Sequence, residues 1–248
     1  MTKTTTILIL IIVFVACKDQ PKKDTDTKPE EATSTEIEVD KEPEWVSLFD
    51  GKTLNGWHVY NGRDISSHWS VEDGALAFAG RKGSPEYNIV TDKEYTNFKL
   101  SLEWKISVNG NSGIMWGVIE DEKFDHPYDT GAEIQVLDND GHPDGKFPSH
   151  RAGALYDLIV PPDGITKPVG EWNTCEIYIN HRANEGKVWL NGTLTAEFPL
   201  SGDKWDAMIA ESKFKDWEHF AKSKTGRICL QDHEDKVWYR NIKIQELD

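Results

Sequence analysis

The chain has 248 residues, of which 38% are hydrophobic, and a formal net charge of −15 at pH 7. An acidic chain without a basic stripe argues against nucleic acids and anionic membrane surfaces as partners. The sequence contains no phosphate-binding loop, nucleotide fingerprint, zinc ribbon or serine-nucleophile elbow, so these classes of site are disfavoured as well.

Residues 1–17 predict a lipoprotein signal peptide. An apolar run from Ile7 to Ala16 follows Lys3 and ends directly at Cys17. The run is too short for a membrane-spanning helix, which needs ~20 apolar residues, and a small residue before a cysteine resembles the lipobox of bacterial lipoproteins. We therefore expect acylation of Cys17 and a lipid anchor in the cell envelope, at the outer membrane facing the periplasm or at the cell surface. This anchor is the expected membrane contact.

Residues 18–44 predict a disordered acidic tether. They hold five Lys and ten Asp or Glu but no aromatic residue, so they cannot bury enough apolar surface to offset the entropy lost on ordering. The start of the tether, KDQPKKD, resembles the signals that send lipoproteins of the Bacteroidetes to the cell surface. Residues 45–248 then make up a single domain.

Hydrophobic periodicity predicts that residues 45–248 are all-β. Short runs alternate with a period of two or are rich in β-branched and aromatic residues, and Asp-Gly or Asn-Gly pairs separate them. This pattern favours a jelly-roll sandwich of two antiparallel sheets. Between Lys204 and Phe220 we expect one or two short helical turns, with Trp205, Met208, Ile209 and Phe214 toward the sandwich. The predicted strands include FKLSLEWKI (98–106), AEIQVL (132–137), ALYDLIV (154–160), TCEIYIN (174–180), KVWLNG (187–192), RICLQ (227–231) and VWYRNIKI (237–244).

Cys175 and Cys229 lie in two of these runs. They could form a disulfide in an oxidising compartment, but a buried Cys in a strand also behaves as a small hydrophobic residue. The sequence leaves both states open.

Two of the predicted strands carry a polar face. Glu133 and Gln135 lie on the face opposite Ile134 and Val136, because alternate residues of a strand point the same way. Glu103 and Lys105 repeat the pattern in residues 98–106. Each polar face fits either a ligand-binding sheet or the solvated outer face that antiparallel sandwiches commonly have.

A set of ordered motifs then resembles one family. The strings SLFDGKTLNGW, WSVEDGAL, NSGIMWG, GAEIQVLDND, GALYDLIVPP, GEWNTCEIYI, LNG, SKF and GRICLQDHEDKVWYRNIKIQEL, from the start of the domain to Leu247, are similar to the successive motifs of the 3-keto-disaccharide hydrolase domain family. The resemblance implies a concanavalin A-like jelly roll, related in shape to endo-β-glucanases, and an enzyme that cleaves 3-keto-glycosides.

The resemblance also implies an unusual mechanism. Glucanases of this shape carry paired carboxylates on one strand, whereas here Glu133-Ile134-Gln135 places an amide in the second position. A ketone at C3 acidifies the C2 proton, so the glycosidic oxygen can leave by elimination and water can add afterwards. This route requires a base, an electrophile for the enolate oxygen and an acid for the leaving oxygen.

Glu133 is the leading candidate for the base or for a metal ligand. As a purely structural residue it would pair with Arg151 or Lys105. His150 and His233 are the further catalytic candidates, since histidine exchanges protons near neutral pH. The predicted substrate-binding residues are Gln135, Arg151, Tyr156, Glu103, Lys105, Asn111, Trp116, Gln231 and Arg240.

Tyr156 and Trp116 are chosen among these because a flat ring can stack on a sugar. Asp232 is interpreted as the start of an Asx turn. A divalent cation is compatible with Glu133 and His150 as ligands, although no spacing is diagnostic. The chain carries no motif for an organic cofactor, so a separate oxidoreductase must supply the oxidised sugar.

Two other functions remain open. A non-catalytic carbohydrate-binding lipoprotein would use the same fold. A conventional β-glucan hydrolase would need a second carboxylate near Glu133, for which Glu103 is the strand candidate.

Overall fold

In the computed structural model, which describes residues 43–62, 65, 68–83 and 86–248, two antiparallel β-sheets form most of the regular structure. Residues 42–248 are one compact unit. The predicted signal peptide with Cys17, and the tether up to residue 42, lie outside the described residues. Among the residues that are described, no helix has the length and apolar character needed to cross a membrane.

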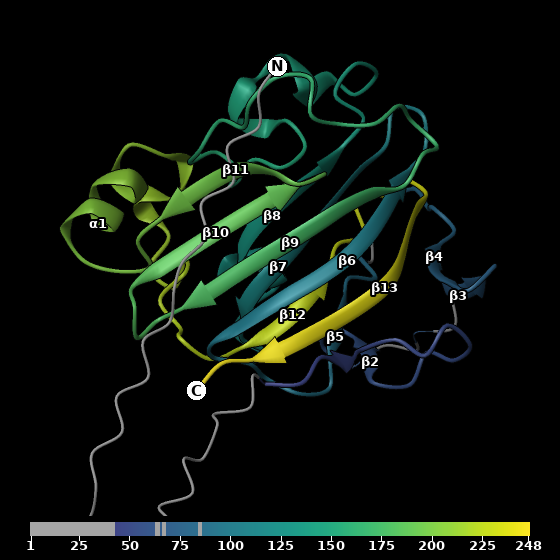
Figure 1. Cartoon of the computed structure of the whole chain (residues 1–248), viewed down its shortest axis with the longest axis horizontal. Coiled ribbons are helices and arrows are strands. Elements are labelled where there is room, and N and C mark those ends of the chain that lie inside the picture. Colours follow the sequence, from purple (N-terminus) through teal and green to yellow (C-terminus); the bar gives the residue numbers. More distant parts are fainter. Residues whose placement is uncertain (1–42, 63–64, 66–67, 84–85) are drawn as a thin grey trace, which may run out of the picture. The chain divides into compact units, whose positions relative to one another are not determined.

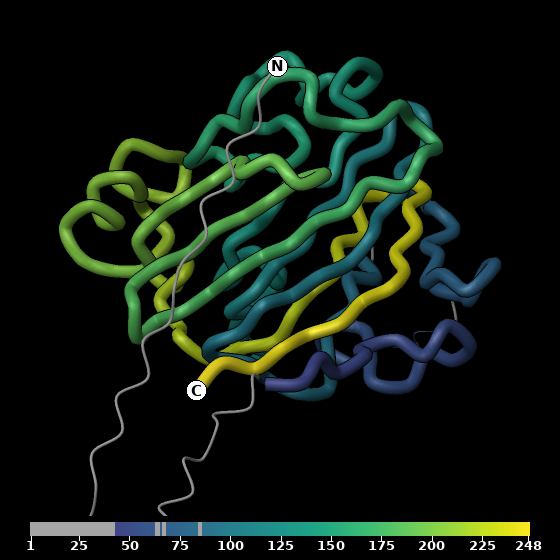
Figure 2. Tube along the Cα trace, viewed as in Figure 1, coloured from purple at the N-terminus to yellow at the C-terminus, as the bar shows by residue number. Residues whose placement is uncertain are grey.

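The larger sheet has the strand order β11-β10-β9-β6-β13-β4-β3, and β1 also pairs with β13 (Figure 1). The Cα trace shows how β6 and β13, distant in the sequence, run side by side along this sheet (Figure 2). Its strands are β1 (Val46–Ser47), β3 (Trp69–Glu72), β4 (Ala75–Phe78), β6 (Phe98–Ile106), β9 (Asn173–Asn180), β10 (Glu185–Leu190), β11 (Thr193–Phe198) and β13 (Val237–Glu246).

The smaller sheet has the order β2-β5-β12-β7-β8. Together with a single α-helix in the described part of the chain, the two sheets confirm the predicted all-β jelly-roll sandwich. The strands of the smaller sheet are β2 (Trp57–Val59), β5 (Ile89–Thr91), β7 (Asn111–Val118), β8 (Ala132–Leu137) and β12 (Arg227–Leu230).

The two sheets differ in how many of their faces are covered. Along β6, buried residues alternate with partly or fully exposed ones, because one face meets the core and the other meets solvent. Every residue of β7 is buried, and in β8 only Glu133 is partly exposed. The smaller sheet is therefore covered on both faces, by the larger sheet on one side and by loops on the other.

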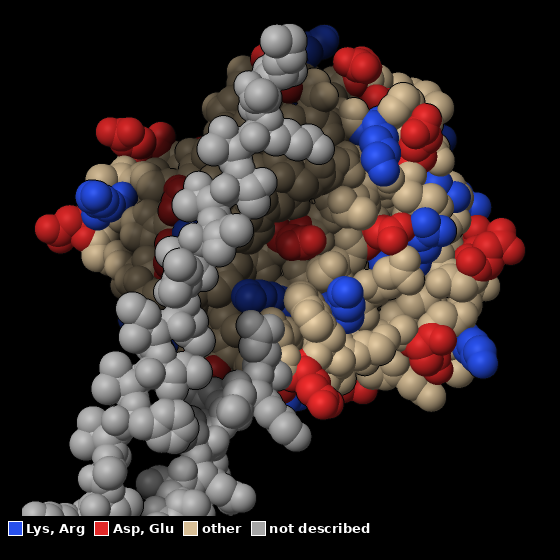
Figure 3. Space-filling model, viewed as in Figure 1, with Lys and Arg blue, Asp and Glu red and all other residues tan. Residues whose placement is uncertain are grey.

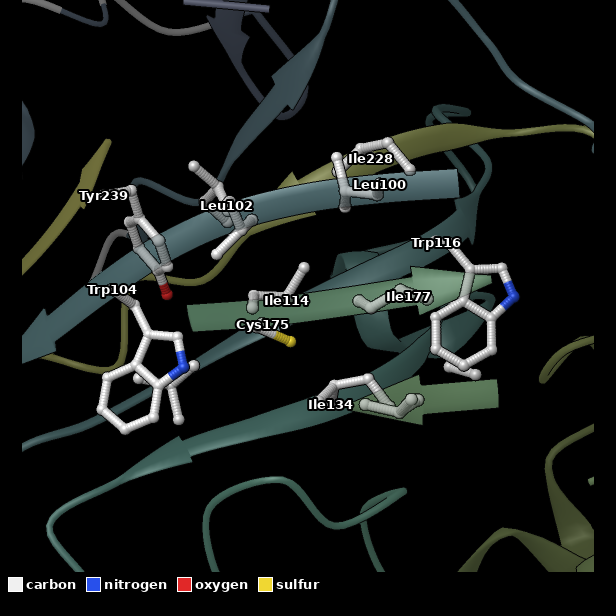
Figure 4. Close-up of a cluster of buried hydrophobic side chains, with 14 of the residues drawn as sticks. Leu100, Leu102, Trp104, Ile114, Trp116, Ile134, Cys175, Ile177, Ile228 and Tyr239 are labelled. Atoms are coloured by element: carbon white, nitrogen blue, oxygen red, sulfur yellow. The ribbon is translucent and has the colours of Figure 1, made fainter. Parts of the chain in front are cut away.

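The core between the sheets holds several residues for which the sequence allowed other roles (Figure 4). Trp116 is 6% exposed and stacks on Phe198 at 5.9 Å between ring centroids. The prediction that Trp116 stacks on a sugar is therefore wrong, because its strand turns that side chain toward the core. Cys175 lies in the same core, and both Cys175 and Cys229 are buried free thiols.

The predicted strand ALYDLIV is also wrong. Leu155 makes only isolated bridges with Ile134 and Ile159. Asp157 has a φ of 61°, in the left-handed region that breaks an extended strand, and the Leu158 N–H returns to the Leu155 carbonyl. The apolar residues of this run pack against the core as a series of turns.

Short helical segments occupy the long connections. The expected helical region contains α1 (Asp203–Ala210) and the 3-10 helix η5 (Lys213–Asp216). Trp205 and Phe214 are buried in the core cluster, as predicted. The remaining 3-10 helices are η2 (Pro127–Asp129), η3 (Pro143–Lys146) and η4 (Pro148–His150).

Candidate functional site

A cleft of about 270 Å³ opens over the face of the smaller sheet that is turned away from the core. Its floor comes from β7, β8 and the end of β12, and its walls come from the loops around η2, the turn after η4 and η5. The lining residues are Glu86, Asn111, Tyr128, Gly131, Glu133, Gln135, Tyr156, Lys213, Phe214, Trp217, Phe220, Gln231, Asp232 and His233.

Strand register gathers the polar floor. Glu133 is paired with Met115, Gln135 with Gly113, and Leu137 with Asn111. Paired residues on neighbouring strands point to the same face, so Asn111, Glu133 and Gln135 all reach the cleft. This outcome decides between the two interpretations of the polar face on β8, which is a cleft floor and not a solvated surface.

Glu133 is the most perturbed acid of the cleft. Burial raises its pKa to about 8; the charge of Lys213 acts in the opposite direction, and that of Asp144 raises the pKa slightly further. A carboxyl group that titrates near neutral pH in a cleft is suited to exchange protons with a ligand.

Gly113 leaves the space that the Glu133 side chain occupies. A Cβ atom at position 113 would overlap with Oε1 and Cδ of Glu133. Glycine inside a strand often marks such a close approach. The carboxyl group thus lies over the β7 backbone instead of pointing into solvent.

Lys213 is the cation of the site. Its Nζ lies 4.1 Å from the ring centroid of Tyr156 and 5.1 Å from that of Phe214. Loss of solvation lowers its pKa, against the opposing charges of Glu133, Asp157 and Asp144. Lys213 stands in the SKF string, one of the family-like motifs, but the sequence does not predict it as a site residue, because a lysine beside a helical turn has no distinctive spacing.

His150 lies behind the cleft wall and does not line it. Its ring stacks on Tyr156 at 4.4 Å between centroids, and its Nε2 is 3.2 Å from Oδ1 of Asp157. Oδ2 of Asp157 accepts a hydrogen bond from the Lys213 N–H at 2.8 Å. His150 and Asp157 therefore support Tyr156 and Lys213, the two residues that do line the cleft.

The end of β12 contributes three residues in succession. Gln231 and Asp232 are buried, and His233 is exposed at the rim. Asp232 forms the predicted Asx turn, since its Oδ1 accepts the Glu234 N–H at 2.8 Å, and Arg81 Nε lies 2.5 Å from its Oδ2. Asp232 is thus already bonded within the protein, whereas His233 faces the opening.

Several amide atoms on the floor have no partner in the described part of the chain. They are Oε1 and Nε2 of Gln135, Oδ1 of Asn111 and Oε1 of Gln231. Buried polar atoms are usually hydrogen-bonded, so these atoms are available to a polar ligand.

Aromatic side chains form the wall opposite the floor. Phe214 and Phe220 stack at 3.7 Å between centroids with an angle of 5°, and Trp217 meets Phe214 edge to face at 5.2 Å. Burial raises the pKa of Tyr128 and of Tyr156, so both phenols stay protonated near neutral pH. Tyr128 and Trp217 were not selected from the sequence, because neither stands in a motif that distinguishes it from a core aromatic.

Glu86 is a second carboxylate that lines the cleft, and it is not among the residues predicted from the sequence. Its Oε2 accepts a hydrogen bond from Asn88 Nδ2 at 2.7 Å and lies 3.2 Å from Nδ1 of His126. Only the fold brings this loop residue beside β8, so no local pattern indicates it.

Besides Trp116, four predicted binding residues lie away from the cleft. Arg151 Nη1 donates to Oδ1 of Asp163 at 2.6 Å. Glu103, Lys105 and Arg240 are on β6 and β13, on the solvent face of the larger sheet, where Arg240 Nε donates to Glu103 Oε2 at 2.8 Å. The larger sheet lies in front in Figure 1, and acidic and basic side chains are interspersed on the face seen from that side in Figure 3.

This placement has two consequences for the earlier alternatives. Glu103 is not the second carboxylate of a pair with Glu133, because the two belong to different sheets. Neither Arg151 nor Lys105 lines the cleft beside Glu133, where the cation is Lys213.

The described residues hold no group of three or more His, Cys, Asp or Glu side chains arranged to bind a metal ion. The proposed ligands Glu133 and His150 are separated by the Tyr156 wall, since only Glu133 lines the cleft. Asp138, the acidic residue that follows β8, has a structural role: its Oδ2 accepts the Asn109 N–H at 2.7 Å, and its Oδ1 accepts the Gly141 N–H at 3.0 Å, so its carboxylate stabilises a turn.

Comparisons with known proteins identify relatives of this chain. A curated 3-keto-disaccharide hydrolase from Bacteroides thetaiotaomicron is 33% identical over 235 residues, covering 82% of this chain and 79% of the relative. A solved protein from Parabacteroides distasonis, a proposed glycosyl hydrolase, is 33% identical with a TM-score of 0.76 and covers 82% of this chain and 94% of that one.

More distant structures support the fold alone. A Bacillus subtilis protein with a galectin-like fold has a TM-score of 0.52 at 10% identity, and the alignment covers 78% of this chain and 90% of that one. The family model described as the 3-keto-alpha-glucoside-1,2-lyase-like domain matches residues 44–245. Since this match spans nearly all of the described residues, and the curated relative agrees with it, the chain belongs to the 3-keto-alpha-glucoside-1,2-lyase-like domain family.

Proposed function

We propose that this protein cleaves the glycosidic bond of 3-keto-glycosides, with Glu133 as the base. The observation that carries the proposal is the Glu133 carboxyl group in the cleft, with its pKa raised to about 8 by burial and with Lys213 as a cation that lines the same cleft. The 3-keto-disaccharide hydrolase relative supports the substrate class. A non-catalytic binding protein has no need of such a perturbed acid, so the site favours an enzyme.

The reaction begins with proton transfer from C2 to the Glu133 carboxylate. The electrons of the C2–H bond form an enolate on the C3 oxygen, and the Lys213 ammonium group stabilises this charge. The enolate then expels the C1 oxygen as an alcohol, which leaves a 1,2-unsaturated 3-ketone. Water adds at C1, and C2 regains a proton, so the net change is hydrolysis.

The leaving oxygen needs a proton, and two kinds of donor line the cleft. Tyr128 and Tyr156 remain protonated because burial raises their pKa. His233 lies at the rim, where it was predicted to act as an acid or base. All three can exchange protons with a glycosidic oxygen without a second strand carboxylate.

A carboxylate pair is the second candidate mechanism. Glu86 and Glu133 line the same cleft, and paired carboxylates hydrolyse ordinary glycosides. That mechanism does not require the ketone, so activity on the unoxidised parent sugar separates the two functions.

Glu133→Gln should abolish turnover of a 4-nitrophenyl 3-keto-glucoside, while wild-type protein should leave the unoxidised 4-nitrophenyl glucoside intact. Loss of a general base typically lowers kcat by roughly 10²–10⁴-fold. Release of 4-nitrophenol is the measurement, and Glu103→Gln, on the other sheet, is the matched control that should retain activity. Equal release from both sugars would establish the carboxylate-pair mechanism instead.

Lys213→Met should lower kcat and move the pH dependence of kcat/KM to higher pH. The positive charge of Lys213 lowers the pKa of Glu133, so its removal raises that pKa and the base ionises only at higher pH. Lys215→Met, from the exposed side of η5, should leave the profile unchanged. If the pH profile of Lys213→Met does not shift, the charge of Lys213 does not act on the base, which would contradict this prediction.

Glu133→Gln should also stabilise the fold at alkaline pH. The pKa of Glu133 is about 8 in the folded protein, above that of an unfolded glutamate. Below the unfolded pKa, Glu133 is protonated in both states and does not destabilise the fold. As the pH rises from the unfolded to the folded pKa, the unfolded state ionises more readily, so the folded protein loses stability. We expect the variant to gain roughly 2–5 kcal/mol of unfolding free energy near pH 9 and almost nothing near pH 4. Urea denaturation at the two pH values measures this difference.

The control for this effect is Glu103→Gln. Burial acts to raise the pKa of Glu103, but hydrogen bonds from Asn241 and Arg240 outweigh burial and lower it. This substitution should therefore give no gain in stability at alkaline pH. If Glu103→Gln gains as much unfolding free energy at alkaline pH as Glu133→Gln does, the change in net charge explains the effect, and burial of Glu133 does not.

We also propose that the enzyme is a lipoprotein of the cell envelope, anchored through Cys17. The apolar run that ends at this cysteine supports the proposal. Cells expressing the full chain should incorporate labelled palmitate into the wild-type protein and not into Cys17→Ala. Labelling of both proteins would contradict acylation at this position.

A further inference from the structure

Three amide side chains on the cleft floor carry the further inference. Gln135, Asn111 and Gln231, here called the amide trio, are 1%, 2% and 6% exposed. The trio contains four buried atoms without a hydrogen-bond partner in the described residues: both polar atoms of Gln135, Oδ1 of Asn111 and Oε1 of Gln231. Native proteins keep few such atoms, and a cluster of them beside one cleft calls for a ligand.

Hydrogen bonds fix the backbone of the two glutamines of the trio on the cleft floor. The Gln135 N–H donates to the Ala154 carbonyl at 3.1 Å, and the Gly153 N–H donates to the Gln135 carbonyl at 2.9 Å. The Gln231 carbonyl accepts the Ser112 hydroxyl at 2.7 Å.

Gly113 separates the two glutamines of the trio. It is paired with Gln135 on one side, and its carbonyl accepts the Gln231 N–H at 2.9 Å on the other. Glycine has no side chain to fill the space between them, and Glu133 approaches from one side. The two glutamines therefore flank the position of Gly113, where the Glu133 carboxyl group lies.

The chemistry of the trio selects neutral hydroxyl groups. Amide oxygens accept hydrogen bonds and the amide nitrogen donates them, and a hydroxyl group can do both at once. Anionic ligand groups are disfavoured, because the trio supplies no charge and the neighbouring Glu133 carboxylate repels them. A polyol edge fits both the donors and the acceptors.

The position of the trio relative to Glu133 identifies which edge of the sugar it meets. Same-face neighbours on a strand are separated by about 6.8 Å, twice the rise per residue. Gln135 lies one such step from Glu133, and Asn111, opposite Leu137, lies a further step along the same direction. If C2 of the ketone ring lies against Glu133 and the ring extends along β8 toward Gln135, the edge that carries the C4 and C6 hydroxyls meets the trio.

We infer that the amide trio binds the C4 and C6 hydroxyls of the 3-keto ring and makes the enzyme selective for hexosides over pentosides. This inference rests on the proposed function for the identity of the ring. A site built to hydrogen-bond a hydroxyl discriminates strongly against an analogue that lacks it, because its polar groups are then left unpaired. A xyloside lacks the C6 hydroxymethyl group, so part of the trio would be left without a hydrogen-bond partner when a xyloside binds.

The test compares two substrates in two proteins. Wild-type enzyme should show a kcat/KM for 4-nitrophenyl 3-keto-glucoside at least about 100-fold above that for the 3-keto-xyloside. Gln135→Leu should reduce this ratio to less than about tenfold, mainly by losing activity on the glucoside. Gln245→Leu, a buried glutamine of β13 in the other sheet, is the matched control and should keep the wild-type ratio.

A binding measurement separates this inference from the proposed function. Titration calorimetry with methyl glucoside and methyl xyloside, in both anomeric forms, should show tighter binding of the glucoside to wild-type protein and no preference in Gln135→Leu. Asn111→Ala provides a second variant with the same expected result if Gln135→Leu fails to fold. If wild-type protein shows no turnover but still binds the glucoside more tightly, the proposed mechanism is wrong and the binding role of the trio stands. If wild-type protein treats both sugars equally in both assays, the binding role of the trio is wrong.

Discussion

The site depends on one constraint, the need to cover both faces of the five-stranded sheet. Its inner face packs against the larger sheet, and its outer face is covered by long loops and short helices whose fit leaves a cleft over β7 and β8. Polar residues on that outer face are buried, as Gln135 is, or only partly exposed, as Glu133 is, although their strand alternates polar and apolar residues as a surface strand does. Their perturbed chemistry follows from this burial.

In the proposed mechanism, burial of Glu133 serves function at a cost in stability. The same loss of solvation that raises its pKa to about 8 makes the ionised carboxylate a stronger base and the folded protein less stable when that base is charged. Lys213 limits the cost, because its charge lowers the pKa of Glu133 and would also stabilise an enolate. Active sites commonly trade stability for reactivity in this way.

The sequence predicted most of the fold and part of the site for definable reasons. A period of two identifies β6, β8, β9 and β13, and it places Glu133 and Gln135 on one face. Periodicity cannot tell which polar face a loop will cover, so Glu103 and Glu133 looked equivalent until the sheets were placed. The prediction for Trp116 was wrong because aromatic side chains are common both in protein cores and in sugar-binding sites, so the sequence alone does not distinguish the two. Lys213 and Glu86 come from connections whose positions depend on tertiary packing.

The amide at position 135 connects the mechanism with recognition. A carboxylate there would lie one same-face step from Glu133 on β8, and two nearby acids raise one another's pKa because like charges oppose ionisation. For a mechanism that uses a single base this repulsion would only lower the fraction of ionised Glu133, whereas an uncharged amide leaves the base unaffected and still binds hydroxyls. An amide at position 135 therefore suits the proposed site, in which Glu133 takes a proton and Gln135 binds the sugar.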